Sequence, residues 1–258
     1  MAQWAHNEKL IGYSKEGSGP AVLAFHGTTQ ASNAWDAVRA GLTVDRTWVT
    51  FEFPGSGESS MPDKPIDLDD TISDAVALME HLGHSEFHVV GYSLGAVAAL
   101  RTAALYSSKV TTVTSLCGWA QSDARMRMTF ELWRKLISLD PKLFMHYAIV
   151  DGSAVETISE LEPIFGMALD MASAAIQPGS DAHLELDLRV DIRDCLATIS
   201  APSLIIGGIQ DRWVDVSHSR QIASHISGSQ LVEIDAGHLM INEKAQELAV
   251  LVQKHTSN

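Results

Sequence analysis

What this 258-residue chain has little of narrows the functions it could have. Positive charge is scarce, because 18 lysines and arginines stand against 32 aspartates and glutamates, a formal net charge of −14 at pH 7. A chain of this charge is repelled by polyanions, so we expect neither nucleic acid nor an anionic membrane as a partner. No stretch approaches the roughly 18 consecutive apolar residues of a membrane-spanning helix, which predicts a soluble protein.

Cysteine is scarce too. Only Cys117 and Cys195 occur, as is usual in a reducing compartment, and both are better explained as core residues than as a disulfide or a nucleophile. Residues 1–6 lack the basic segment and apolar core of a secretion signal, so we expect a cytoplasmic protein. The sequence has no phosphate-binding P-loop, no nicotinamide or flavin fingerprint, and no histidine or cysteine pair at ligand spacing. We therefore expect no cofactor and no metal.

Apolar residues are plentiful, at 46% of the chain, and they fall into short runs rich in β-branched side chains. These runs lie at 21–25, 48–53, 87–90, 110–116, 203–206 and 230–234. Helical patterns separate most of them, and the last helix is expected at 241–254. Such alternation predicts an α/β fold with a mostly parallel central sheet flanked by helices.

The alternation stops after Trp119. From 122 to 188 no strand pattern occurs, but helical stretches are expected at 126–137 and 141–149. We interpret this segment as a small helical cap inserted into the sheet domain. The predicted division is therefore a core of residues 1–121 and 189–258, and a cap of residues 122–188.

Residues 91–95 match the pattern G-x-S-x-G between a short apolar strand and an alanine-rich helix at 94–105. A strand that enters a helix through so tight a turn strains the central residue, and Gly91 and Gly95 leave room for the helix to approach. The turn, a nucleophile elbow, sets the Ser93 hydroxyl at a helix N-terminus, where N–H groups can stabilise developing negative charge. The motif predicts Ser93 as the nucleophile of an acyl-transfer reaction.

A serine nucleophile needs a base and an acid that orients the base. His238 follows the last strand pattern and Asp211 follows the preceding one, so both are expected at the same sheet edge as Ser93. Each has a structural alternative, since Asp211 could cap the turn before Val214 and His238 could be an ordinary loop histidine. Three other acids remain open as alternatives: Asp123, Asp215 and Asp235.

The oxyanion of the tetrahedral intermediate needs two N–H donors. The segment from His26 to Thr29 follows the strand at 21–25, which is where a serine hydrolase of this layout needs its second oxyanion donor. We predict the backbone N–H groups of Thr28 and Leu94 as the oxyanion hole, and a structural role for His26.

With these motifs, the chain resembles the α/β-hydrolase superfamily from residue 16 to the terminal helix. Residues 52–59 match the family's acidic-x-Pro-Gly-x-Gly-x-Ser loop, with Glu52 where Asp is usual. Because the elbow residue is Ser93, the chain departs from epoxide hydrolases and haloalkane dehalogenases, which use a carboxylate nucleophile. The cap opening at 117–127 is similar to that of 3-oxoadipate enol-lactonases and the aminoacrylate hydrolases of pyrimidine degradation.

Cap residues usually determine the substrate in such enzymes. We predict four pocket residues, although each could instead serve packing: Trp119, Trp133, Trp213 and Met240. Three arginines concentrate positive charge at the cap entrance: Arg125, Arg127 and Arg134. A guanidinium there, Arg127 above all, could bind a substrate carboxylate, or the arginines could form a solvated face paired with Glu131 or Asp123.

These features together predict a serine hydrolase that cleaves a carboxylic ester or lactone of a small acyl substrate through an acyl-enzyme. The partner would be that small molecule, and a homodimer is compatible with the sequence. Carbon–carbon bond hydrolysis or thioester cleavage on the same fold remains an alternative. A ligand-binding receptor with a slow hydrolase site is an alternative of another class.

Overall fold

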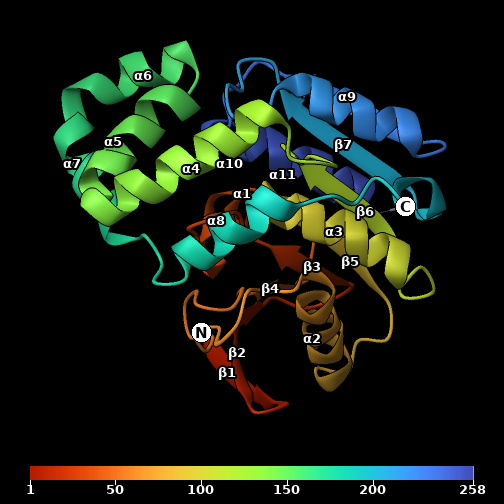
Figure 1. The fold of residues 1–258 in the computed structure, drawn as a ribbon. Helices are drawn as coiled ribbons and strands as arrows, with labels where there is room; N and C mark the ends of the chain where they lie inside the picture. The colour runs from red at the N-terminus through yellow and green to blue at the C-terminus, as the bar shows by residue number, and fades with distance from the viewer. Residues whose placement is uncertain (258) are drawn as a thin grey trace.

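The computed structural model describes residues 1–257 and contains one eight-stranded sheet (Figure 1). The strands are β1 (Ala2–His6), β2 (Lys9–Glu16), β3 (Ala21–Phe25), β4 (Thr47–Phe51), β5 (Phe87–Tyr92), β6 (Val110–Leu116), β7 (Ser203–Gly208) and β8 (Gln230–Ile234). Their order in the sheet is β1-β2-β4-β3-β5-β6-β7-β8. All neighbours from β4 to β8 are parallel, and β2 pairs antiparallel with both β1 and β4. The predicted α/β fold with a mostly parallel sheet is confirmed, and the β1–β2 hairpin is an addition to it.

The described helical segments begin with η1 (Ser32–Trp35), α1 (Asp36–Ala40), α2 (Leu68–His81), α3 (Leu94–Leu105), α4 (Ala124–Leu139), α5 (Pro141–Gly152) and α6 (Val155–Leu161). They continue with η2 (Glu162–Ile164), α7 (Phe165–Ala174), α8 (Ser180–Arg189), η3 (Leu196–Thr198), α9 (Val216–His225), α10 (Met240–Glu243) and α11 (Ala245–His255). The helix expected at 241–254 is thus divided at Lys244. No helix among residues 1–257 has both the length and the apolar stretch needed to cross a bilayer.

Both faces of the central sheet are covered, and β3 shows how. Its alternate residues enter different cores: Leu23 and Phe25 pack with α2 and α3, whereas Val22 and Ala24 pack with α1 and α11. Side chains alternate across a strand, so a strand buried on both faces has to be apolar throughout. This explains why the central strands are recognisable as continuous apolar runs.

Between β6 and β7 the chain forms the helices α4 to α8 and no strand of the sheet. Figure 1 shows α4, α5, α6 and α7 grouped to one side of the molecule, away from β1 and β2. The two connections to this helical segment lie side by side, since Ile192 donates its N–H to the Ala120 carbonyl at 2.7 Å and Ser122 donates to Val190 at 3.1 Å. These bonds lie close to the predicted cap boundaries at 122 and 188, which themselves stay a prediction.

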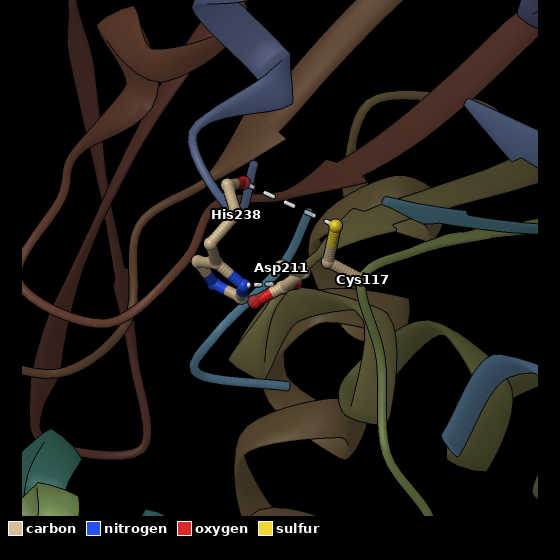
Figure 2. A group of neighbouring side chains, drawn as sticks. All are labelled: Cys117, Asp211 and His238. Atoms are coloured by element: carbon tan, nitrogen blue, oxygen red, sulfur yellow. Dashed lines mark hydrogen bonds and ion pairs between the residues drawn. The ribbon is translucent and has the colours of Figure 1, made fainter. Parts of the chain in front are cut away.

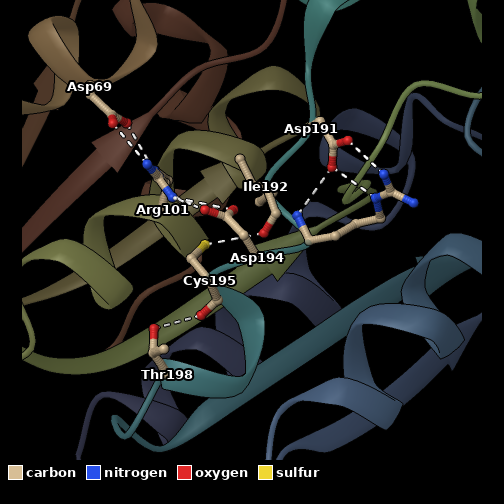
Figure 3. A network of polar contacts seen from close by, with 8 residues as sticks. Asp69, Arg101, Asp191, Ile192, Asp194, Cys195 and Thr198 are labelled. Carbon is tan, nitrogen blue, oxygen red and sulfur yellow. Dashed lines mark hydrogen bonds and ion pairs between the residues drawn. The ribbon is translucent and has the colours of Figure 1, made fainter.

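The segment that leaves the helical insert is held to the core by a polar network (Figure 3). Arg101 of α3 donates to both carboxylate oxygens of Asp69 on α2, at 2.9 and 2.8 Å, and lies 3.5 Å from Asp194. The buried Cys195 thiol donates to the Ile192 carbonyl at 3.2 Å. Cys195 is thus a free, buried core thiol, as expected, and it precedes the short helix η3.

Candidate active site

Ser93 lies in the turn between β5 and α3, with φ 57° and ψ −121°. This conformation is strained for a residue other than glycine, as expected of a nucleophile elbow. A Cβ atom at Gly91 would overlap the Gly95 carbonyl, and one at Gly95 would overlap the Phe25 carbonyl. Both glycines are therefore required by the close approach of α3 to the sheet.

Hydrogen bonds join the three residues predicted as a triad. His238 Nε2 lies 2.9 Å from Ser93 Oγ, and His238 Nδ1 lies 2.7 Å from Asp211 Oδ2. The three residues follow β5, β7 and β8, whose carboxyl ends meet at one edge of the parallel sheet. All three side chains are buried, with exposed fractions of 8% or less, so the hydrogen bonds are shielded from water.

Asp211 combines the two roles that the sequence left open. Its Oδ1 accepts the N–H groups of Trp213 and Val214, both at 2.9 Å, so it caps the turn after β7. Its Oδ2 remains for His238. The three alternative acids are engaged elsewhere: Asp123 with His218 at 3.3 Å, Asp215 as the cap of α9, and Asp235 with Gln210 at 2.7 Å.

The backbone of His238 is anchored as well. Its carbonyl accepts the Tyr92 hydroxyl at 2.9 Å. The same carbonyl lies 3.9 Å from the Cys117 sulfur (Figure 2). Ligand atoms of Cys117, Asp211 and His238 lie within 4.8 Å of one another, the single group among residues 1–257 that could hold a metal ion. Metal binding would need the thiolate, but burial and the nearby Asp211 raise the pKa of the Cys117 thiol. The geometry therefore favours a hydrogen-bonded set.

The loop after β3 lies against the elbow, since a Cβ atom at Gly27 would be 3.2 Å from that of Ser93. His26 beneath it donates from Nδ1 to the Gly27 carbonyl at 2.8 Å and accepts the Phe53 N–H at Nε2, 3.2 Å away. Burial lowers the pKa of His26 to about 4, so the ring stays neutral. These contacts agree with a structural role for His26.

The two predicted oxyanion donors are the N–H groups of Leu94 and Thr28. Leu94 is the first residue of α3, so its N–H is one of the four that an α-helix leaves without an internal acceptor. Thr28 lines the same cavity as Ser93. Its hydroxyl donates to Asp187 Oδ2 at 2.7 Å, which ties the loop to α8. Asp187 leaves no trace in the sequence, because no local pattern links it to Thr28, 159 positions away.

A cavity of about 700 Å³ opens above Ser93 and His238, between the core and helices α4 to α7. Four aromatic residues line it: Tyr92, Trp133, Phe144 and Trp213. The Trp213 ring lies 4.9 Å from that of His238, and Trp133 meets Trp213 edge to face at 4.4 Å between ring centres. Asp151 accepts the Trp213 ring N–H at 2.9 Å and so fixes this wall beside His238.

A family model described as "Alpha/beta hydrolase family" matches residues 21–251. The chain belongs to the alpha/beta hydrolase family.

Individual relatives match over most of the chain. Pyrrolizixenacetamide deacetylase of Xenorhabdus hominickii is 29% identical over 247 residues, 94% of this chain and 93% of that protein. The 2-(acetamidomethylene)succinate hydrolase of Mesorhizobium japonicum is 23% identical over 246 residues, 92% and 87% of the two chains. The enol-lactonase structure from Burkholderia xenovorans matches with a TM-score of 0.87, at 18% identity and 100% coverage of both chains. At 18% identity this match shows a shared fold. The predicted resemblance to enol-lactonases is therefore found in the fold.

Of the predicted pocket residues, this alpha/beta hydrolase places Trp133 and Trp213 on the cavity wall. The other two, Trp119 and Met240, lie outside the lining, and so does Arg127. Trp119 is fully buried and donates its ring N–H to Ser122 at 2.9 Å. Met240 is fully buried in the core beneath the triad loops, and Arg127 donates to the Ser122 carbonyl. The positions of Trp119 and Met240 beside strand ends did not reveal which way these side chains face.

Proposed function

We propose that this alpha/beta hydrolase is a serine hydrolase that cleaves a carboxylic ester or lactone of a small acyl substrate. The observation that carries the proposal is the continuous hydrogen-bond chain from Ser93 through His238 to Asp211, which opens into the cavity. A nucleophile, a base and an acid in this arrangement are what acyl transfer at neutral pH requires.

In the acylation half, Ser93 Oγ attacks the substrate carbonyl while His238 Nε2 takes its proton. Asp211 holds the Nδ1–H tautomer and stabilises the imidazolium that forms. Negative charge develops on the former carbonyl oxygen, and we assign the N–H groups of Leu94 and Thr28 to it. The carbonyl then re-forms, and His238 gives its proton to the departing alcohol oxygen, which leaves an acyl group on Ser93.

Deacylation repeats these steps with water. His238 Nε2 takes a proton from a water molecule, whose oxygen attacks the acyl carbon, and then returns a proton to Ser93 Oγ. The products are the carboxylic acid and the free enzyme. With a lactone, the alcohol and acid remain in one molecule.

The test is hydrolysis of nitrophenyl esters of increasing acyl length. The Ser93→Ala and His238→Ala variants should lose about 10⁴-fold or more in kcat while they remain folded. His218→Ala is a matched control, because His218 also faces an aspartate, at 3.3 Å, but does not line the cavity. Unchanged turnover in a folded Ser93→Ala protein would disprove the proposal.

An amide is a second candidate substrate, because the relative that is 29% identical is named as an acetamide deacetylase. An acyl-enzyme forms from esters, thioesters and amides alike, so mass spectrometry of the Ser93 peptide during turnover separates acyl transfer from carbon–carbon cleavage without an acyl-enzyme. Comparing an ester with an amide of the same acyl group then identifies the preferred bond.

A further inference from the structure

The cavity wall carries charge of one sign. Its carboxylates are Glu160 and Glu243, and no lysine or arginine is among the described residues that line it. The chain as a whole carries a formal charge of −14. A substrate therefore meets a wall without a cation in a protein that is already acidic.

Three cations of the helical insert are engaged with other partners. Arg127 donates to the Ser122 carbonyl, and Arg134 of α4 binds both carboxylate oxygens of Asp181, at 2.6 and 2.8 Å. Lys142 of α5 pairs with Asp170 of α7. None of the three arginines at the cap entrance, Arg125, Arg127 and Arg134, lines the cavity, so the expectation that one of them binds a substrate carboxylate has no support in this geometry.

The two glutamates differ in what their oxygens do. Glu243 accepts the N–H groups of Ala154, at 2.8 Å, and Gly237, at 2.9 Å, so its oxygens are already used to join the insert to the His238 loop. Glu160 is exposed on α6, and its side chain takes part in no hydrogen bond or ion pair among residues 1–257. Glu160 is thus the carboxylate on the wall that is free to meet a substrate.

From this placement we propose that Glu160 and the lack of a cation make the site select against anionic substrates, so that its substrates are neutral or cationic acyl compounds. This inference rests on the proposed hydrolase function. A carboxylate that entered the cavity would lose water and gain no cation. A substrate ammonium group would gain Glu160 and the faces of Trp133 and Trp213, which attract cations.

The test uses three nitrophenyl esters of equal acyl length that end in a methyl, a carboxylate or a trimethylammonium group. At about 0.15 M salt the Debye length is about 8 Å, so the charge of the distant surface is screened. We expect wild-type kcat/KM for the carboxylate ester to be about tenfold or more below that for the methyl ester. Glu160→Lys should narrow this gap about fivefold and lower kcat/KM for the trimethylammonium ester.

Glu162→Lys is the matched control, because Glu162 is exposed two residues further along, outside the lining, and the variant has the same net charge. It should leave the ratio between the esters unchanged. Equal kcat/KM for carboxylate and methyl esters in the wild type would overturn the inference, and so would equal effects of the two lysine variants.

A binding experiment separates this inference from the proposed function. Tryptophan fluorescence of the Ser93→Ala variant, which has Trp133 and Trp213 on the wall, can report binding of hexanoate and hexyltrimethylammonium. We expect a lower Kd for the ammonium compound, and a Kd ratio that Glu160→Lys reverses. If no ester is hydrolysed but this ratio is found, the proposed function fails and the charge selection stands. A lower Kd for hexanoate would overturn the selection itself.

Discussion

Replacing Asp187 by asparagine should stabilise this alpha/beta hydrolase, and by about 3 kcal/mol more at pH 7.5 than at pH 5. Asp187 is fully buried; its Oδ2 accepts the Thr28 hydroxyl and its Oδ1 has no hydrogen-bond partner. Burial disfavours the charged form and raises the pKa of this carboxyl from 3.8 to about 8. Asparagine keeps an oxygen for Thr28 and has no charge, as the protonated acid does.

The sign and size of the effect follow from proton linkage. Between pH 4 and pH 8 the folded protein keeps a proton on Asp187 that the unfolded chain has released, so the free energy of unfolding falls as the pH rises. Each pH unit corresponds to about 1.4 kcal/mol. From pH 5 to pH 7.5 the wild type should therefore lose about 3 kcal/mol through this group, and Asp187→Asn should not. Burial lowers the pKa values of the nearby His26 and His183 from 6.5 to about 4 and about 3, which makes the free energy of unfolding rise with pH up to about 6.5. This contribution is the same in both proteins and cancels in their difference.

The assay is equilibrium unfolding in denaturant at pH 5, 6, 7 and 8, for both proteins. The difference in the free energy of unfolding should grow steadily with pH. Asp181→Asn, on the same helix, is the control: Arg134 lowers the pKa of this exposed carboxyl, so its titration is complete below pH 5 and its curve should run parallel to that of the wild type. If the Asp187→Asn and wild-type curves also ran parallel from pH 5 to pH 8, the reasoning about Asp187 would be refuted.

Two further substitutions test the cavity and the elbow. Ala172→Phe, on the cavity face of α7, should fill part of the cavity of roughly 700 Å³ and so shift the preferred nitrophenyl ester to shorter acyl chains. The control Ala174→Phe lies outside the lining and should leave the preference unchanged. Equal chain-length profiles of the two variants would contradict this. Gly95→Ala should lower the free energy of unfolding by about 1–3 kcal/mol and lower kcat, because the new Cβ would meet the Phe25 carbonyl. The control Gly166→Ala, whose Cβ would meet no neighbouring atom within 4 Å, should raise the free energy of unfolding by up to about 1 kcal/mol. A stable, active Gly95→Ala protein would contradict the elbow geometry.

The sheet and the three hydrogen-bonded residues could be predicted because each leaves a local trace in the sequence. Strands buried on both faces are apolar throughout, as Ala21–Phe25 is. Ser93, Asp211 and His238 each follow such a strand, and parallel strands bring their carboxyl ends to one edge. The hairpin left no such trace, because Lys9–Glu16 is mostly polar and half-exposed and forms a strand by pairing with β1 and β4.

The residues of the cavity wall could not be predicted in the same way, because the wall is formed by side chains from helices that lie far apart in the sequence. Trp119 and Trp133 are both aromatic residues of the cap region, but only Trp133 faces the cavity, whereas Trp119 turns to Ser122. Asp187 lies 159 residues from Thr28. The amino-acid composition of the chain says more about the charge of the cavity wall than the sequence positions of single residues do.

In a chain with 32 acidic and 18 basic residues, cations are outnumbered, and a carboxylate is available to pair with most of them. Arg134 and Lys142, for example, are used to join α4 to α8 and α5 to α7. The charge left without a partner on an inner surface is then a carboxylate, and on the cavity wall it is Glu160. The same acidic excess that disfavours polyanions as partners at long range thus favours, inside the cavity, a substrate without a negative charge.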